Sequence, residues 1–157
     1  MKDLSRVFCT LSSTDKFDAI DEVISSCSIF TELPDRNRFI ETVHRRERVQ
    51  STGIGHGVAI AHGKVAHIEG VYVGLGFSER GIIFDQHYPE PVRLVFVIAS
   101  CPVKEADYLR ATASILTWVH DPEFRKVLVG KEWDDERVVR FFDMLSSQHF
   151  VPQFQTR

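Results

Sequence analysis

The sequence predicts an α/β domain in which helices flank a mixed central β-sheet, a three-layer α/β/α sandwich. Apolar residues recur at helical spacing near both ends of the chain, whereas the middle of the chain is rich in branched apolar residues that alternate with glycines. Helices before and after a block of strands favour helical layers on both sides of one sheet. A two-layer α+β domain is the alternative, because these patterns do not fix the strand order.

The first half of the chain predicts two helices. Ser13 or Thr14 can cap the first, whose apolar positions follow helical spacing. These positions are Phe17, Ile20, Val23, Ile24 and Cys27. Pro34 and Asp35 then supply a start signal for a second helix, which we expect to end near Arg46 and Glu47.

The middle of the chain predicts strands. Residues 71–77 alternate apolar side chains with glycine and tyrosine, and residues 82–84 follow a Glu-Arg-Gly turn, so we expect these two runs to pair as a hairpin. Residues 92–99 are almost entirely apolar and rich in branched side chains. Such a run is typical of a strand covered on both faces, and we expect it to be the central strand.

The last third predicts three helices. Residues 105–119 carry apolar side chains at helical spacing. Asp121 and Pro122 then form a cap and a first-turn proline, and Gly130 can end that short helix. We expect Asp134 to cap the final helix, and from about residue 147 the pattern assigns no structure to the tail.

Composition narrows the function classes. With 157 residues and 43% hydrophobic content, residues 1–157 are expected to form one domain. A net charge of -3 gives no attraction to nucleic acid or to an anionic membrane. Three scattered cysteines and no metal-ligand spacing among the histidines argue against disulfides, a metal site and a metal cofactor. No signal peptide and no segment for membrane insertion are expected, and the reducing cytoplasm is the expected location.

Residues 51–63 hold four glycines and two histidines around a strand-like run. Glycine lets the chain turn tightly and lets a second molecule come close to an imidazole. A neutral imidazole is a good nucleophile near neutral pH, so His62 can accept a phosphoryl group. Arg46 can hold two phosphoryl oxygens with its planar fork. From the residues alone, a merely structural histidine and a solvated arginine remain the alternatives.

Arg46-Glu47 and the block from Ser51 to Lys64 resemble the active-site block of the fructose/mannitol-type enzyme IIA domains of the bacterial phosphotransferase system. The block is most similar to their nitrogen-regulatory branch. Similarity also appears in residues 83–85 and 91–96 and in the helix after Cys101. The resemblance therefore covers most of the chain.

The resemblance implies a mixed sheet flanked by helices and assigns roles to the site. His62 would accept the phosphoryl group from a histidine phosphocarrier protein, with Arg46 beside it. Beyond what the resemblance implies, we expect further hydrogen bonds to the phosphoryl group from Thr52, Gly53, Gly55, His56, Gly57 and Tyr108.

Three positions depart from the family pattern. Ala61 stands where the family has proline, His56 where it has asparagine or a similar residue, and Tyr108 where it has a second active-site histidine. Tyrosine can donate one hydrogen bond but cannot carry the charge of a protonated histidine. A purely structural role for Tyr108 is equally compatible with the sequence.

The leading hypothesis is a cytoplasmic, phosphoryl-accepting regulatory protein, a histidine-dependent phosphotransferase by resemblance, with no cofactor. Its expected partners are the phosphocarrier protein and regulated protein targets. Two alternatives stay open. Tyr108 and Ala61 favour a regulatory binding module that acts without phosphorylation, and the family also contains soluble IIA components of sugar transport systems.

Overall fold

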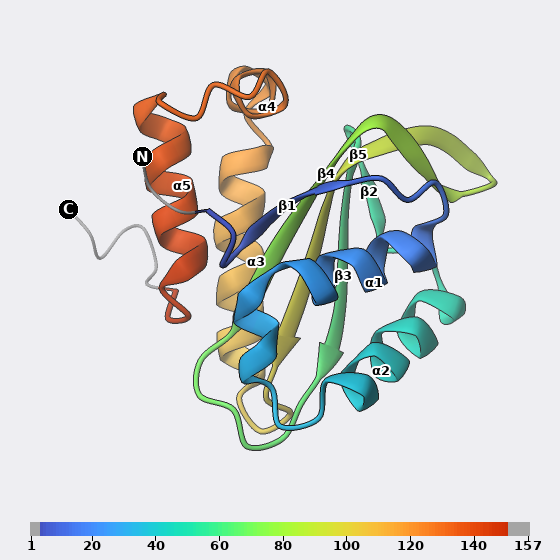
Figure 1. Ribbon diagram of the computed structural model, residues 1–157, viewed down its shortest axis with the longest axis vertical. Helices are drawn as coiled ribbons and strands as arrows, with labels where there is room; N and C mark the ends of the chain where they lie inside the picture. Colours follow the sequence, from blue (N-terminus) through green and yellow to red (C-terminus); the bar gives the residue numbers. More distant parts are fainter. Residues whose placement is uncertain (1–3, 151–157) are drawn as a thin grey trace.

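A five-stranded mixed sheet lies between layers of helices in the computed structural model, which describes residues 4–150 (Figure 1). The predicted α/β sandwich is confirmed. The strands are β1 (Phe8–Leu11), β2 (Gly53–Gly55), β3 (Val58–Lys64), β4 (Tyr72–Asp85) and β5 (Tyr88–Ser100). The helices are α1 (Lys16–Ser26), α2 (Arg36–Val49), α3 (Glu105–Val119), α4 (Pro122–Val129) and α5 (Glu136–Ser146), with a short 3-10 helix η1 (Ser28–Glu32).

The strand order is β1-β4-β5-β3-β2, with β5 in the middle. Strands β4 and β5 are antiparallel, β3 runs parallel to β5, β1 runs parallel to β4, and the short β2 is antiparallel to β3. Residues 94–99 of β5 are all buried, as expected of a strand covered on both faces. The predicted central strand is therefore confirmed.

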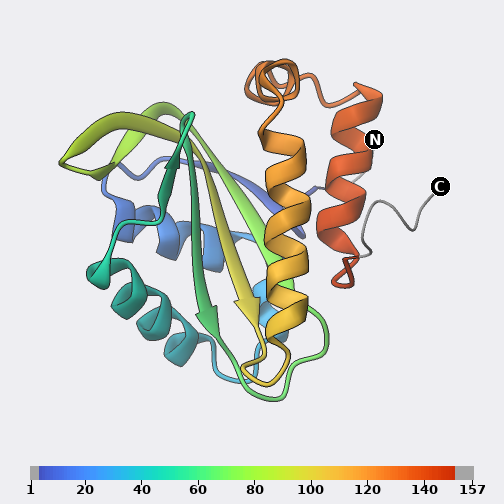
Figure 2. The same cartoon turned by 180° about the vertical axis from the view of Figure 1, so that it is seen from behind.

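Helices cover both faces of this sheet. Helix α2 packs on β3 and α1 packs on β4 and β5, while α3 packs on β5 and α5 on β4. Figure 1 shows α1 and α2 in front of the strands, and Figure 2 shows α3 and α5 over the opposite face. Because side chains alternate along a strand, Gly63 meets α2 whereas His62 points to the α3 side.

The predicted hairpin between residues 71–77 and 82–84 is wrong. Residues 72–77 and 82–84 both belong to the single strand β4, and its antiparallel partner is β5, which follows a turn after Asp85. The register shifts between Phe77 and Ile82, where the Glu-Arg-Gly sequence makes a bulge and not a reversal. The real reversal lies where the His87 amide donates a hydrogen bond to the Asp85 carboxylate, with an N–O distance of 2.9 Å.

The helix limits agree with the sequence at most ends and differ at two caps. Asp15, not Ser13 or Thr14, caps α1, since its carboxylate accepts from the amides of Phe17 and Asp18. Ser13 instead binds the carboxylate of Glu22.

Asp35 caps α2 as predicted, but this helix runs to Val49, a few residues beyond its expected end. Asp135, not Asp134, caps α5. Helix α3 has the predicted limits, and Asp121 and Gly130 flank α4 as expected. In the tail, Phe150 is buried and the Gln148 carbonyl accepts from the Val71 amide, while residues 151–157 lie outside the described part.

Gly63 allows the close contact between β3 and α2. A methyl group added there would lie 2.9 Å from Val43 Cγ2 and 3.1 Å from Phe39 Cε1. Gly63→Ala should therefore lower the free energy of unfolding by about 1–3 kcal/mol, the usual cost of overpacking. Gly53→Ala is the control, because its nearest contact would be 3.4 Å away. Urea unfolding measures both, and equal stability of Gly63→Ala and the wild type would refute this packing account.

Candidate active site

A cavity of about 230 Å³ lies at the edge of the sheet where α2, β3 and α3 meet. Strand β2 pairs only with the first residues of β3, at Val58 and Ala59, so the outer edge of β3 near His62 carries no further described strand. The sheet edge, the helix end and the segment before β2 thereby surround the imidazole. The lining residues are Arg46, Gln50, Ser51, Thr52, Gly53, Ile54, Ile60, His62, Tyr108, Thr112 and Leu116.

His62 and Tyr108 are in contact inside this cavity. The Tyr108 hydroxyl lies 3.4 Å from Nδ1 of His62, at the long end of hydrogen-bond distances, and the two ring centroids are 5.0 Å apart. The imidazole is partly buried. Nδ1 therefore faces the Tyr108 hydroxyl.

Lys64 places a positive charge beside Tyr108. Its ammonium lies 4.3 Å from the centre of the Tyr108 ring and 2.6 Å from the Glu105 carboxylate, and it also reaches the Ser100 hydroxyl at 3.2 Å. A cation over an aromatic face is attracted by the ring quadrupole. Tyr108 thus has a neighbouring cation, although it carries no charge itself.

The cavity favours the neutral form of His62. Burial lowers the pKa of His62 below its usual value, and the positive charges of Arg46 and Lys64 act in the same direction. A hydrogen bond with the Ile60 backbone and the charge of Glu105 act in the opposite direction and offset part of the effect. A neutral imidazole keeps a lone pair on one nitrogen, which is what a nucleophile needs.

Glu47 holds together the segments that surround the cavity. Its carboxylate is 1% exposed and accepts hydrogen bonds from both the amide and the hydroxyl of Thr52. It also forms an ion pair with Lys16 of α1, at 3.1 Å. Lys16 in turn donates to the carbonyl of Phe84 in β4. One buried carboxylate therefore ties α1, the end of α2 and the segment before β2 together.

Arg46 precedes this anchor and points to the cavity. Its Nη1 donates to the carbonyl of Gln50, with an N–O distance of 2.7 Å. That bond holds the guanidinium over the end of α2, where a positive charge also interacts favourably with the helix dipole. Arg46 and His62 line the same cavity, as the sequence predicts for a phosphoryl clamp and its nucleophile.

The structure places the remaining predicted site residues at different points. Thr52 and Gly53 line the His62 cavity, but both donors of Thr52 bind Glu47, and the Gly53 amide donates to Ser51. The donors of Thr52 therefore hold the segment before β2 to Glu47. Gly55, His56 and Gly57 do not line this cavity.

His56 lies at the tip of the β2–β3 turn, where residues 55–57 all have positive φ angles. It lines two neighbouring grooves, one with Leu116 and His120 and one with Arg93 and Arg125. The expected contribution of the turn to phosphoryl binding stays a prediction.

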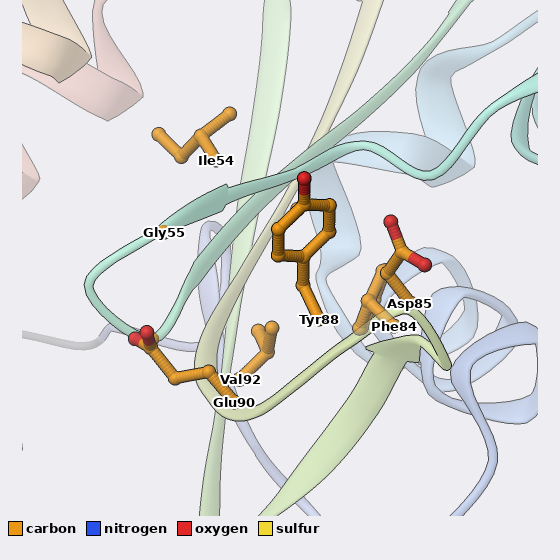
Figure 3. Close-up of a pocket in the computed structure, with 9 residues that line it drawn as sticks. Ile54, Gly55, Phe84, Asp85, Tyr88, Glu90 and Val92 are labelled. Atoms are coloured by element: carbon orange, nitrogen blue, oxygen red, sulfur yellow. The ribbon is translucent and has the colours of Figure 1, made fainter.

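Larger hollows on the surface contain no His62. The groove of His56 and His120 is about 670 Å³, and a pocket of about 320 Å³ lies between β2 and the β4–β5 turn. Figure 3 shows this pocket with the Tyr88 ring standing between Asp85 on one side and Glu90 on the other. It is lined by carboxylates and apolar groups, which do not suit a phosphoryl anion. The volume of a hollow alone would therefore not have selected the cavity that contains His62.

Two global features of the described residues bear on the site. Within residues 4–150 no three histidine, cysteine or acidic side chains are grouped so that they could hold a metal ion. None of the described helices has the length and apolar character that crossing a membrane requires.

Residues 2–143 match the family described as phosphoenolpyruvate-dependent sugar phosphotransferase system, EIIA 2. The chain belongs to this family. It is 32% identical over 125 residues to the fructose-specific EIIABC component of Bacillus subtilis, a match that covers 80% of this chain and 20% of that protein. It is also 31% identical over 118 residues to a nitrogen regulatory protein of Bradyrhizobium diazoefficiens, covering 75% of this chain and 76% of the relative. The chain thus spans only a fifth of the first relative.

Solved structures of IIA proteins share the fold. Nitrogen regulatory protein IIA-Ntr from Neisseria meningitidis superposes with a TM-score of 0.70 at 22% identity, over 81% of this chain and 86% of that one. Mannitol IIA from Escherichia coli superposes with a TM-score of 0.69 at 16% identity, over 90% and 99% of the two chains. At these identities the likeness establishes the architecture and leaves the site chemistry to this chain's own residues.

Two residues with clear roles carried no assignment at the sequence level. Glu47 follows Phe39 and Val43 at intervals of four, so it falls on the buried face of α2, where a carboxylate needs partners. This periodicity is the sequence signal from which the buried position of Glu47 could have been predicted. Lys64 ends the glycine-rich block, but only the fold brings it to Tyr108.

Loss of the Glu47 carboxylate should weaken the whole domain. Glu47→Ala leaves the Thr52 donors without their acceptor and Lys16 without its ion-pair partner, and we expect the free energy of unfolding to fall by about 3 kcal/mol, as for other broken buried pairs. Glu41→Ala, on the exposed side of the same helix, is the matched control, with an expected change below about 0.5 kcal/mol. If chemical denaturation gave both variants wild-type stability, Glu47 would not be an anchor.

The pKa of His62 offers a direct test of the electrostatics. Because burial and two cations lower it, NMR titration of the His62 ring should give a midpoint below the ordinary histidine value of about 6.5. Arg46→Gln and Lys64→Met should each move the midpoint upward, since each removes a positive charge that opposes protonation. Nucleophilic activity should fall as the pH drops through that midpoint. A midpoint above the ordinary value in the wild type would contradict the description.

Proposed function

We propose that this protein is a phosphoryl-accepting regulatory component of a phosphotransferase system, in which His62 takes a phosphoryl group from a histidine phosphocarrier protein. The observation that carries the proposal is the shared cavity of His62 and Arg46, in which the imidazole is held neutral. Family membership and the nitrogen regulatory relative support the same role. The cytoplasmic location is part of this proposal.

In the proposed step, the Nε2 lone pair of His62 attacks the phosphorus atom carried by the partner's histidine. The new N–P bond forms as the old one breaks, and the electron pair of the old bond returns to the partner's ring. Neither ring gains or loses a proton in this exchange. His62 keeps its proton on Nδ1, and the Tyr108 hydroxyl, 3.4 Å away, can accept a hydrogen bond from it.

The surroundings supply charge for the transferred group. The guanidinium of Arg46 can bind two phosphoryl oxygens at once, and such fixed donors stabilise the charge that spreads over these oxygens during transfer. Lys64 adds a second cation next to Tyr108, partly balanced by Glu105. In this proposal Tyr108 orients the ring, and Arg46 and Lys64 provide the charge.

Two other functions have an observation in their favour. The fructose-specific relative favours a IIA component that passes the phosphoryl group to the next protein of a sugar transport system. Tyr108, with no charge of its own, favours a binding module that works without phosphorylation. Relay of the label from His62 to a IIB protein would support the first, and partner binding unchanged by His62→Ala would support the second.

Transfer from a phosphocarrier tests the leading proposal. Wild-type protein, incubated with its phosphocarrier, the upstream kinase and labelled phosphoenolpyruvate, should gain an acid-labile label, and His62→Ala should gain none. Arg46→Gln should accept the label roughly 100-fold more slowly, the cost of removing one strong oxyanion donor. His87→Gln, an exposed histidine outside the cavity, should match the wild type. An unlabelled wild type, or equal labelling of His62→Ala, would rule the proposal out.

A further inference from the structure

The Thr112 hydroxyl is the one buried side-chain oxygen or nitrogen in residues 4–150 that has no hydrogen-bond partner. Buried polar atoms in folded proteins are almost always paired, because an unpaired donor has lost its water without replacement. The unpaired hydroxyl of Thr112 therefore needs an explanation. The position of Thr112 in the fold provides that explanation.

Thr112 faces the His62 cavity. Tyr108, Thr112 and Leu116 are spaced by four residues on α3, and all three line the cavity. Residues at this spacing lie on one side of a helix. The unpaired hydroxyl thus belongs to the same helix face whose tyrosine contacts the imidazole.

The conformation of Thr112 differs from that of other helical threonines in this chain. Thr42 and Thr117 each donate to the carbonyl four residues earlier, at 2.9 Å, which is the usual way for a helix to satisfy this side chain. Thr112 has the Tyr108 carbonyl at the same spacing and makes no such bond. Its hydroxyl is left uncommitted, and threonine in a helix can change between two χ1 rotamers.

The other threonine of the cavity has no donor to spare. Both donors of Thr52 bind the Glu47 carboxylate. Of the two threonine hydroxyls at the cavity, only that of Thr112 remains free to donate. A phosphoryl group brings three oxygens, all of them acceptors, into a space that already holds Arg46.

We propose that the Thr112 hydroxyl donates a hydrogen bond to an oxygen of the phosphoryl group on His62, an inference that rests on the proposed function above. The hydroxyl is shielded from water in the empty cavity, so a rotation about χ1 of Thr112 accompanies the arrival of the group. Thr112 keeps its proton and forms no covalent bond. The N–P bond is made and broken at His62 alone.

The proposed hydrogen bond is testable because its loss should slow phosphoryl transfer without destabilising the fold. Thr112→Val replaces the hydroxyl by a methyl group of similar size, and the rate of phosphoryl transfer from the phosphocarrier protein should fall roughly 10-fold or more, as on removing an oxyanion donor. Its unfolding midpoint in urea should equal or exceed that of the wild type, because an unpaired buried hydroxyl is removed. Thr112→Ser should retain most of the transfer rate.

Thr117→Val is the matched control on the same helix, since the Thr117 hydroxyl is already bonded to the Ala113 carbonyl. Its transfer rate should equal that of the wild type. A wild-type rate for Thr112→Val would overturn the inference and leave the proposed function intact. Equal slowing of Thr112→Val and Thr112→Ser would also overturn it, because the hydroxyl would then not be the active group. A wild type that accepts no phosphoryl group at all would defeat both proposals together.

Discussion

The buried carboxylate of Glu47 is the constraint on which the site depends. It sits one residue after Arg46, at the end of α2, and accepts from Thr52 just before β2 and from Lys16 of α1. A charge in such a place is tolerated only when several donors surround it. Because those donors come from two other segments, satisfying the carboxylate fixes the end of α2 against the sheet edge. The position of Arg46 beside His62 follows from that requirement.

The same geometry favours the neutral, nucleophilic form of the imidazole on which the proposed function depends. His62 is buried enough to lose part of its hydration, and Arg46 and Lys64 further oppose its protonation. In the proposed function both cations also attract the phosphoryl anion, so they stabilise the product and keep a lone pair available on the nucleophile. Tyr108 lies against Nδ1 of His62, with Lys64 over its ring. In the proposed function Tyr108 orients the imidazole of His62, and Lys64 supplies a positive charge.

The sequence predicted the architecture, the central strand and the limits of α3 well, because apolar periodicity and capping residues are local signals. It also predicted that Arg46 and His62 lie together, because Arg46-Glu47 and the nearby block from Ser51 to Lys64 resemble one active-site region. It failed where the outcome depended on distant partners. The Glu-Arg-Gly sequence became a bulge in β4 because β5 pairs with both sides of it. The hydroxyl of Thr52 went to Glu47, and that of Thr112 stayed unpaired, through contacts that no spacing in the sequence encodes.

The central claim is that Nε2 of His62 carries the phosphoryl group while Nδ1 keeps its proton beside Tyr108. Nitrogen-15 NMR of the histidine side chains, recorded before and after exposure to the charged phosphocarrier protein, tests it most directly. The account predicts a phosphorus coupling at Nε2 of His62 and a retained Nδ1–H signal. A phosphorus coupling at Nδ1, at another histidine, or at no residue of the chain would contradict it.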